Sequence, residues 1–547
     1  MPDHLFPQNR RVLLALTLLL YCGTVHAAVE AAQVFTDHMV LQRDIAVPVW
    51  GWATAGEAIT VAIDGQEQKT VTDSTGRWLV HLTPLPLGAP RTLTISGAGE
   101  TLRFNDILLG DVWVCAGQSN MVWSVSAAKD AKQEIAAATH PEIRLFEVGG
   151  GRSPQQLRDR FDPTSQEGIM GPPRPLCVWR PCTPESVASF SAVGYYFGRA
   201  LQQHLAVPVG LIHTAVGATP VEAWMGHAAL GSNAVGRGVL DVWAARDAFA
   251  ETAEGKAQLK ALAEASAKKF GKFGYRADGW LAPLNRLGHP STFFNSRVHP
   301  LIPFALKGVI WYQGEANTSY AAEYRTLFPT LITDWRAQWG QGDFPFLFVQ
   351  LANWGGLPPE KPMPNTWAEL REAQAQALTL PHTGMAVAID VGEAAAMHPL
   401  NKQAVGERLA LAARAVAYGE QLLHSGPVLR SATVDGPRIR LAFDAVGGGL
   451  VARAGGPLRS FAIAGQDQVF VWADAVIQGD NTLVVSAAAV PQPVAVRYGW
   501  YHNPDCNLAN AEGLPAAPFR TDTWPGQTDH SGFQAMAKMP VAFPMPK

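Results

Sequence analysis

From Asp106 to Tyr418 the sequence alternates between short apolar runs and longer amphipathic stretches, and this alternation constrains the fold more than any other feature. The apolar runs are expected strands, because parallel strands covered on both faces read as continuous hydrophobic segments. They span residues 107–116, 207–213, 305–312, 344–351 and 385–390. The helical stretches span residues 186–205, 321–339, 367–378 and 400–418. The pattern predicts an α/β fold, a parallel sheet with helices on both faces.

Two β-rich segments flank this region, in a chain whose 547 residues are enough for two or three domains. Residues 30–104 carry short apolar runs broken by Gly and Pro turns, which is typical of an accessory β-sandwich. Residues 105–425 form the predicted α/β domain, with a helical insertion at about 226–300 that contains the Ala- and Lys-rich stretch 241–270. Residues 426–525 are again rich in short strands and return to the α/β domain, and residues 526–547 are a C-terminal tail.

The first 27 residues have the pattern of a secretory signal peptide. Arg10 and Arg11 precede the apolar run 12–21, and a small-residue cleavage site precedes Ala28. The run is about half the roughly 20 residues that a membrane span needs. We therefore expect an exported protein, periplasmic or secreted, without stable membrane insertion. Cys22 raises the alternative of a lipid-modified cysteine, but the bulky Tyr21 before it disfavours that processing.

Composition narrows the classes of partner. The formal charge of −3 and the lack of a basic patch argue against nucleic acid, whereas 17 tryptophans suit stacking on sugar rings as well as packing in cores. Cys177 and Cys182 are the expected disulfide pair in an oxidising compartment. Without a Cys-x-x-Cys motif or a His cluster nearby, no metal site is predicted.

Ser119 is the candidate nucleophile. It lies in Gly117-Gln-Ser-Asn-Met121, directly after the first predicted strand, and ligands of α/β sheets bind beyond the carboxyl ends of strands. An ordinary turn serine is the competing interpretation. The Gly-x-Ser-x-Gly motif of α/β-hydrolases is absent, because Met121 occupies the second glycine position.

His398 is the candidate base, because it follows the last predicted strand and precedes a rigid helix start at Pro399 with Asn401 as a possible cap. A serine hydroxyl becomes an effective nucleophile only when such a base takes its proton. Asp390 at the end of that strand is the first candidate to orient the imidazole, and Glu393 is the second. A purely structural role for Asp390 as a brace of the loop is weighed equally, and a backbone carbonyl is a further candidate to hold the imidazole.

Other polar residues after strands are candidates for an oxyanion hole. Gln313 and Asn317 offer amide hydrogens, Glu315 between them is expected to brace the loop, and Gly217 offers an unobstructed backbone N–H. Structural bracing alone is the competing interpretation for each.

Together these segments resemble the sialate O-acetylesterase family, carbohydrate esterases of the SGNH-hydrolase superfamily. The resemblance rests on motifs that occur in the same order along most of the chain: Phe35–Gln42, Gly110–Met121, Trp311–Asn317, His398–Lys402 and Asn507–Asp522. It implies a flavodoxin-like catalytic sheet, a jelly-roll-like accessory unit, and cofactor-free hydrolysis of sugar acetyl esters by Ser119 and His398.

The chain departs from the family pattern at two places. Ala395 and Ala396 stand where relatives often carry an acid shortly before the catalytic histidine, which leaves the third triad member open. Ala218 replaces a second glycine and Arg297 replaces a methionine, so the pocket is expected to differ, although a guanidinium also suits a sialate carboxylate.

We therefore predict an acetylesterase acting on an acetylated glycan, with xylan, xyloglucan and sialic acid all open as carriers and plant cell-wall glycans weakly favoured. Two alternatives remain at this stage. One is a secreted carbohydrate-binding protein that has lost catalysis, and the other is an esterase or lipase for different acyl groups.

Overall fold

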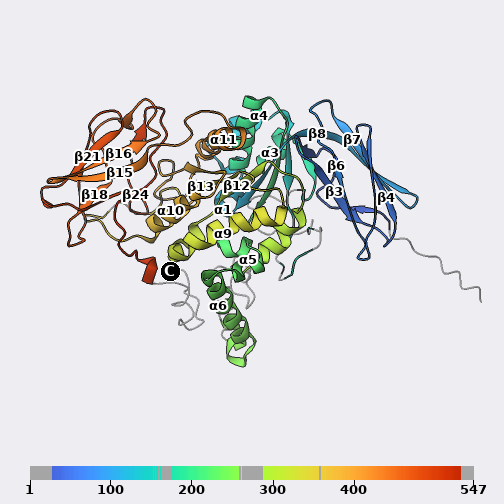
Figure 1. The fold of residues 1–547 in the computed structure, drawn as a ribbon, viewed down its shortest axis with the longest axis horizontal. Coiled ribbons are helices and arrows are strands. Elements are labelled where there is room, and N and C mark those ends of the chain that lie inside the picture. Colours follow the sequence, from blue (N-terminus) through green and yellow to red (C-terminus); the bar gives the residue numbers. More distant parts are fainter. Residues whose placement is uncertain are drawn as a thin grey trace, which may run out of the picture.

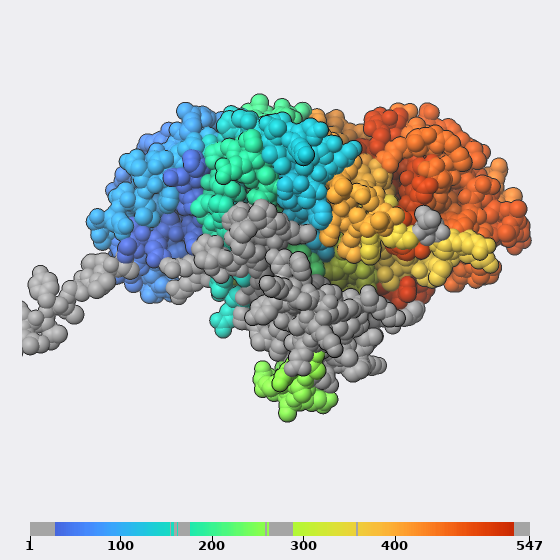
Figure 2. All heavy atoms as spheres, turned by 180° about the vertical axis from the view of Figure 1, so that it is seen from behind, coloured from blue at the N-terminus to red at the C-terminus, as the bar shows by residue number. Residues whose placement is uncertain are grey.

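The computed structural model describes residues 28–151, 153, 155–157, 161, 175–257, 260–261, 288–356 and 359–530. The expected signal peptide and most of the expected C-terminal tail lie outside these residues. Three parts follow one another along the long axis of the molecule (Figure 1): N-terminal sheets, a central α/β region and C-terminal sheets. From behind, the N-terminal and C-terminal residues occupy opposite ends of the molecular surface (Figure 2).

The central sheet is built from parallel strands at the places where the apolar runs predict them. Its order is β9-β11-β8-β12-β13-β14, with β10 added antiparallel at the β9 edge. If β9 is left out and the other parallel strands are numbered along the chain, β11-β8-β12-β13-β14 reads 2-1-3-4-5. In this order the direction of strand addition reverses at β8. Their bounds are β8 Glu100–Gly117, β9 His140–Glu147, β10 Trp179–Cys182, β11 Val209–Ala215, β12 Gly308–Tyr312, β13 Phe346–Gln350 and β14 Thr383–Val387.

Helices cover both faces of this sheet, as the sequence pattern predicts (Figure 1). α4 packs against α11 and strands β9 and β11, while α9 packs against α10 on the other side. Aromatic side chains of α9 pack against those of the strands: Phe328 lies edge-on to Phe348, with 5.1 Å between the ring centroids. The bounds are α3 Pro184–Ala188, α4 Ala192–Leu205, α9 Ala321–Trp339, α10 Thr366–Gln376 and α11 Lys402–Tyr418.

The N-terminal sheets share a strand with the central sheet. The first half of β8 pairs antiparallel with β7, and its second half pairs parallel with β11 and β12. The change falls near Asp106, whose backbone has φ = 55°, and whose carboxylate accepts hydrogen bonds from Arg144 and His38 at 2.7 Å each. The other strands of this unit are β1 Glu30–Ala31, β2 Val40–Gln42, β3 Val47–Trp52, β4 Ala58–Ile63, β5 Gln66–Val71, β6 Arg77–Leu82 and β7 Arg91–Gly97.

The two terminal β units differ in their cores. Apolar side chains of the N-terminal sheets belong to the same buried cluster as the α/β region, for example through ring contacts of Phe35 and Trp50 with Phe304. The C-terminal sheets have a separate buried cluster that includes Phe443 and Tyr498. Their strands are β15 Val428–Asp435, β16 Arg438–Asp444, β17 Leu450–Ala452, β18 Phe461–Ala464, β19 Val471–Trp472, β20 Asp474–Ile477, β21 Thr482–Ser486, β22 Ala495–Tyr498, β23 Leu508–Asn510 and β24 Phe519–Arg520.

The expected insertion begins with α5 His227–Gly231, which packs against α9, and α6 Ala234–Glu251, which projects from the α/β region (Figure 1). The predicted helix 241–270 therefore starts earlier than expected, and most of its second half lies outside the described residues. Cys182 is a free buried thiol, so the expected bond between Cys177 and Cys182 is not formed. Within the described ranges, no helix combines the length and apolar character that crossing a bilayer requires.

Candidate active site

Ser119 lies where the sheet order reverses. It opens the short helix α1, Ser119–Val122, directly after β8, and β8 is flanked by β11 and β12. Gly117 makes this turn possible, because its φ is +138° and a Cβ there would lie 2.2 Å from the carbonyl oxygen of Tyr312. Only 9% of Ser119 is exposed. The position beyond the carboxyl end of a strand, at the reversal of strand order, is a typical ligand-binding place in open α/β sheets.

His398 lies in the loop between β14 and α11, as the sequence predicts. Asn401 caps α11, since its side chain accepts a hydrogen bond from the backbone N–H of Ala404 at 3.2 Å. The Nε2 atom of His398 is 2.8 Å from the Ser119 hydroxyl oxygen. With the ring proton on Nδ1, the hydroxyl donates to Nε2, which is the arrangement in which an imidazole can accept the serine proton.

The surroundings of His398 favour its neutral form. Burial, and after it the positive charge of Lys402, lower the pKa of the imidazole below its usual value. Trp123 stacks on the ring at 4.9 Å between centroids with an interplanar angle of 18°. Among the residues that the structure describes, Ser119 is the only hydrogen-bond partner of the imidazole. The ring is thus oriented by stacking and by the serine rather than by a carboxylate.

A buried polar cluster joins the loop of Ser119 to the loop of His398. The amide nitrogen of Asn120 donates to Glu315 Oε1 at 2.5 Å and to the carbonyl oxygen of Met397 at 3.2 Å. Its amide oxygen accepts a hydrogen bond from Lys402 Nζ. The residue after the nucleophile therefore holds the residue before the base. Bracing by Glu315, which the sequence analysis expected, takes this form.

Burial shifts the pKa values of both charged members of the cluster, Glu315 and Lys402. Burial raises the pKa of Glu315, whose second carboxyl oxygen has no hydrogen-bond partner within the described structure. Burial lowers the pKa of Lys402 to about 7, against the opposing charge of Glu315. The ammonium also lies 5.4 Å from the ring centroid of Tyr312 and 5.9 Å from that of Trp123. Aromatic faces replace part of the solvation that the ammonium loses.

Gly217 lies against the nucleophile. A Cβ at this position would be 3.4 Å from the Cβ of Ser119, which places the turn after β11 beside the serine. No described residue accepts a hydrogen bond from the backbone N–H of Gly217 or of Ser119. Two free donors near one hydroxyl are the elements from which an oxyanion hole is built.

The side chains of Gln313 and Asn317 point into a hydrogen-bond network of their own. Gln313 donates both amide hydrogens, to the Thr219 carbonyl at 3.1 Å and to Asn317 Oδ1 at 2.6 Å. Asn317 in turn donates to Glu222 Oε2 at 3.1 Å. Both amides are fully buried. Gln313 therefore has no hydrogen left for an oxyanion, and Asn317 keeps at most one.

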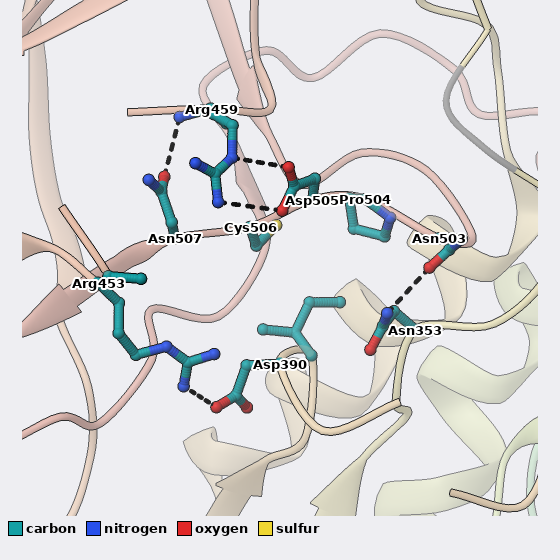
Figure 3. A pocket seen from close by; sticks show the side chains of 11 residues that line it. Asn353, Asp390, Arg453, Arg459, Asn503, Pro504, Asp505, Cys506 and Asn507 are labelled. Carbon is teal, nitrogen blue, oxygen red and sulfur yellow. Dashed lines mark hydrogen bonds and ion pairs between the residues drawn. The ribbon is translucent and has the colours of Figure 1, made fainter. Parts of the chain in front are cut away.

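Asp390 does not reach the imidazole. Its carboxylate accepts hydrogen bonds from both ends of the Arg408 guanidinium, at 2.6 and 2.7 Å, and forms an ion pair with Arg453 (Figure 3). Glu393, the second candidate, is exposed and accepts a hydrogen bond from the backbone N–H of Leu400 at 2.9 Å. The expectation that Asp390 orients His398 is corrected accordingly: it braces the loop by binding two arginines.

Arg297 is also structural. The side chain is only 2% exposed, and its guanidinium donates to the carbonyl oxygens of Val148, at 3.1 Å, and of Gly150. Its position in the π-helix Phe294–Val298 directs it into the protein. Pairing with a substrate carboxylate, which the sequence left open, is unsupported. No cluster of three or more His, Cys, Asp or Glu side chains suited to a metal occurs within the described residues.

Asn120, Trp123 and Lys402 complete this site, and none of them is among the candidate residues predicted from the sequence. One signal for Lys402 was present: a cation at the first position of a helix opposes the helix dipole and therefore needs a specific partner. Asn120 stood inside the motif that was quoted for Ser119, but nothing local in the sequence shows that it reaches a loop 277 residues later.

Comparison with known proteins gives consistent results. A family model described as carbohydrate esterase, sialic acid-specific acetylesterase, matches residues 294–415. The chain is 32% identical over 438 residues to the sialate O-acetylesterase of Rattus norvegicus, with 73% of this chain and 75% of that protein covered. The human sialate O-acetylesterase is 31% identical over 433 residues, with 73% of each chain covered.

A solved structure is similar over nearly the whole length. It is that of a carbohydrate acetylesterase from Xanthomonas citri, with 39% sequence identity and a TM-score of 0.75. The match covers 91% of this chain and 100% of that chain. The similarity therefore includes the terminal β units as well as the α/β region.

Proposed function

This chain belongs to the sialate O-acetylesterase family of carbohydrate esterases, and from that premise we propose that it removes acetyl groups from glycans by a Ser119–His398 dyad. It is a carboxylic ester hydrolase that acts on carbohydrate O-acetyl groups. The observation that supports the dyad is the 2.8 Å contact between the Ser119 hydroxyl and His398 Nε2. The order of strands around β8 supports assignment of the α/β region to the SGNH-hydrolase fold.

In the proposed reaction, Ser119 Oγ attacks the acetyl carbonyl carbon while its proton moves to His398 Nε2. The negative charge that develops on the carbonyl oxygen is stabilised by the backbone N–H groups of Ser119 and Gly217. Collapse of this intermediate breaks the bond between the carbonyl carbon and the sugar oxygen and leaves Ser119 acetylated, and the departing sugar alkoxide takes the proton from His398. Water then attacks the acetyl-serine, loses a proton to His398 and releases acetate, and the proton returns to Ser119.

No carboxylate is assigned to the imidazole. Stacking on Trp123 fixes the ring plane, and the Asn120–Met397 hydrogen bond fixes the backbone that carries the ring. Packing orients the ring as an acid does in a triad, but none of the described residues offers the imidazolium formed during the reaction an ion pair. We therefore assign the chain a dyad rather than a triad.

For the acyl group we propose acetate. The turn of Gly217 lies close against Ser119, and a site closed around a methyl group rejects longer chains by crowding. One added methylene can change discrimination by about 1 to 3 kcal/mol. Aryl acetates should therefore be hydrolysed more than tenfold faster than aryl butyrates. Faster butyrate hydrolysis would contradict the small pocket and favour a lipase-like activity.

For the sugar we propose an acetylated cell-wall polysaccharide such as xylan or xyloglucan, reached after export. The amino-terminal pattern supports this choice. O-acetylated sialic acid is the second candidate, supported by the activity named for the mammalian relatives. Acetate release from acetylated xylo-oligosaccharides and xyloglucan, compared with release from 9-O-acetylated sialic acid, decides between them. Preference for the sialate would overturn the cell-wall proposal.

A further inference from the structure

The turn after β11 carries Gly217 and needs support from its surroundings. The next residue, Ala218, has φ = 59°, a left-handed conformation that is unfavourable for a residue with a Cβ. The carbonyl oxygen of Thr219, which follows, accepts a hydrogen bond from Gln313 Nε2 at 3.1 Å. This hydrogen bond comes from the loop after β12, whereas Gly217 lies against Ser119. The position of the Gly217 N–H therefore depends on residues that do not belong to the turn.

A chain of buried hydrogen bonds runs through Gln313 in one direction. The Tyr324 hydroxyl donates to Gln313 Oε1 at 3.0 Å, and Gln313 Nε2 donates to Asn317 Oδ1 at 2.6 Å. The same oxygen of Asn317 accepts from the backbone N–H of Val221 at 2.9 Å. The nitrogen of Asn317 donates to Glu222 Oε2 at 3.1 Å. Donation therefore runs from Tyr324 to Glu222, whose carboxylate is the final acceptor.

The charge of Glu222 decides which way the amide of Asn317 points. Glu222 belongs to the 3-10 helix η2, Val221–Trp224, directly after the turn, and is only 3% exposed. An ionised carboxylate can only accept hydrogen bonds, so the nitrogen of Asn317 has to face it and the oxygen is left for the backbone N–H of Val221. A protonated carboxyl can also donate, and then both orientations of the amide become possible.

The surroundings of Glu222 bring its protonation into the neutral range. Burial raises the pKa of Glu222 to about 7, against the hydrogen bonds that the carboxylate accepts. The charge of Glu323, on α9, raises this pKa further, and that of Arg246, on α6, lowers it. Tyr320 and Tyr324 also lie near the carboxylate, but burial raises the pKa of both phenols, so they stay neutral. Glu222 therefore changes its charge near neutral pH.

We propose that ionised Glu222 is a positioning residue for the oxyanion hole: it fixes the amide of Asn317 and, through Gln313, the turn that carries Gly217. The assignment rests on the proposed function, because it takes the Gly217 N–H as a donor to the oxyanion. Such a donor has to lie where the negative charge develops, so a displaced turn lowers the rate of the chemical step. Binding of the neutral ester depends little on this donor, so the effect falls on kcat rather than on KM.

Steady-state hydrolysis of an aryl acetate by Glu222→Gln, measured across neutral pH, tests this directly. The amide keeps the volume of the carboxyl but can donate as well as accept, so it imitates the protonated residue. Above about pH 8, kcat should be about tenfold below wild type while KM stays within about twofold. Below about pH 6, Glu222 of wild type is itself protonated, so the ratio of the two kcat values should approach one.

The pH dependence of this ratio separates positioning by charge from a merely structural role. Protonation of His398 and of Lys402 affects both proteins alike and cancels in the ratio. A variant that is only loosened would lose the same fraction of its rate at every pH. A ratio that stays constant with pH would therefore overturn the proposal. Glu67→Gln, on β5 and with a side chain that is 54% exposed, is the matched control and should match wild type throughout.

Glu323→Gln tests the same point without changing the hydrogen-bond chain, and stays informative if Glu222→Gln does not fold. Removing the Glu323 charge lowers the pKa of Glu222, so more of the carboxylate stays ionised as pH falls. This variant should have a higher kcat than wild type near about pH 6.5 and an equal kcat above about pH 8. An unchanged profile in folded Glu323→Gln would contradict the role of the Glu222 charge.

The readouts also separate this inference from the proposed function. Aryl acetate hydrolysis that survives Ser119→Ala would contradict the proposed function. A constant ratio between wild type and Glu222→Gln, in a protein that Ser119→Ala inactivates, would contradict the positioning role of Glu222 alone.

Discussion

The loop from Asp390 to His398 is held by charged groups at both ends. Burial decides the direction of the pKa shift of these groups at the His398 end but not at the Asp390 end. At Asp390, burial would raise the pKa of the carboxyl, but direct hydrogen bonds from Arg408, together with Arg453, outweigh it and lower the pKa. At the His398 end, the buried charges of Lys402 and Glu315 are separated by the amide of Asn120. There burial prevails, so the pKa of Lys402 falls and that of Glu315 rises.

This difference shows what each anchor can do. Directly paired charges, as at Asp390, give a mechanically firm attachment whose protonation changes only in acid. Charges separated by a neutral amide remain costly, so their protonation can change near neutral pH. The first arrangement suits a structural clamp. The second places a titratable cation beside the imidazole and so affects the chemistry of the base.

Replacing the nucleophile should have the largest effect. Ser119→Ala should reduce kcat for aryl acetate about 10⁴-fold or more, and His398→Ala should be comparably damaging, because nucleophile and base act as a unit. Thermal unfolding of Ser119→Ala should match wild type. Ser126→Ala, on an exposed nearby serine, is the matched control. Activity of Ser119→Ala within about tenfold of wild type would remove the serine from the mechanism.

Removing the buried ammonium should come next. Lys402→Met should lower kcat/KM at pH 7 about tenfold, because Asn120 loses the partner that positions it between the two loops. The pH profile should also move. The base works only when neutral, so wild-type activity falls as pH decreases through a pKa below 6.5. Without the positive charge that pKa rises, and the acid limb should shift to higher pH.

The direction of that shift distinguishes an electrostatic effect from a folding defect. A variant that only loosens the loop would lose activity without moving the acid limb. Lys69→Met, at an exposed position of β5, should change neither the rate nor the pH profile. An unchanged limb in folded Lys402→Met would contradict the proposed influence of the ammonium on His398.

At the other end of the loop, Asp390→Asn should affect stability more than catalysis. The variant leaves Arg408 without its carboxylate, which should lower the free energy of unfolding by about 3 kcal/mol in urea titrations at pH 7. The value of kcat should stay within about threefold of wild type. A loss near 10⁴-fold with intact folding would restore Asp390 as a triad acid.

The same pair predicts how stability depends on acid. Because the pKa of folded Asp390 lies below its usual value of 3.8, its contribution is complete above that value and is lost as pH falls through the folded pKa. Wild type should therefore lose stability below about pH 3.8 more steeply than Asp390→Asn.

The smallest effect is expected at Glu393, which lies within the same loop but is exposed. Glu393→Gln keeps an oxygen that can accept from the backbone N–H of Leu400. Its free energy of unfolding should change by less than about 0.5 kcal/mol, and steady-state rates should be unaltered. A marked fall in kcat would mean that the Glu393 charge acts on the imidazole.

Local patterns were sufficient to predict the elements that position the site. The apolar runs of β11, β12, β13 and β14 and the helices α9 and α11 were found close to their observed bounds, because buried strands and amphipathic helices have strong periodic signals. For β8 only the end was predicted, since the strand begins seven residues before the predicted start at residue 107. The strand β9 was missed. Its first residues include Pro141 and the charged Glu142, so the strand does not read as a continuous apolar run, although its second half is buried.

It was harder to predict which side chains bind one another than to predict which residues lie near the site. Ser119 and His398 were found because each follows a strand at the same sheet edge. Asp390 was a plausible partner by sequence distance, but the arginines that bind it include Arg453, which lies 63 residues later in another unit. Gln313 likewise turned inward to Thr219 and Asn317. Such choices depend on tertiary contacts that no local pattern contains.

The strand β8 has a consequence for modularity. Our sequence-based boundary at residues 104 and 105 falls inside this strand, which runs without a break from Glu100 in the N-terminal sheets to Gly117 beside the nucleophile. A recombination breakpoint there would leave each fragment with half a strand and an unpaired edge. The N-terminal unit therefore cannot be exchanged for another domain without disrupting the catalytic sheet. In evolution or in engineering, it has to be inherited together with the catalytic sheet.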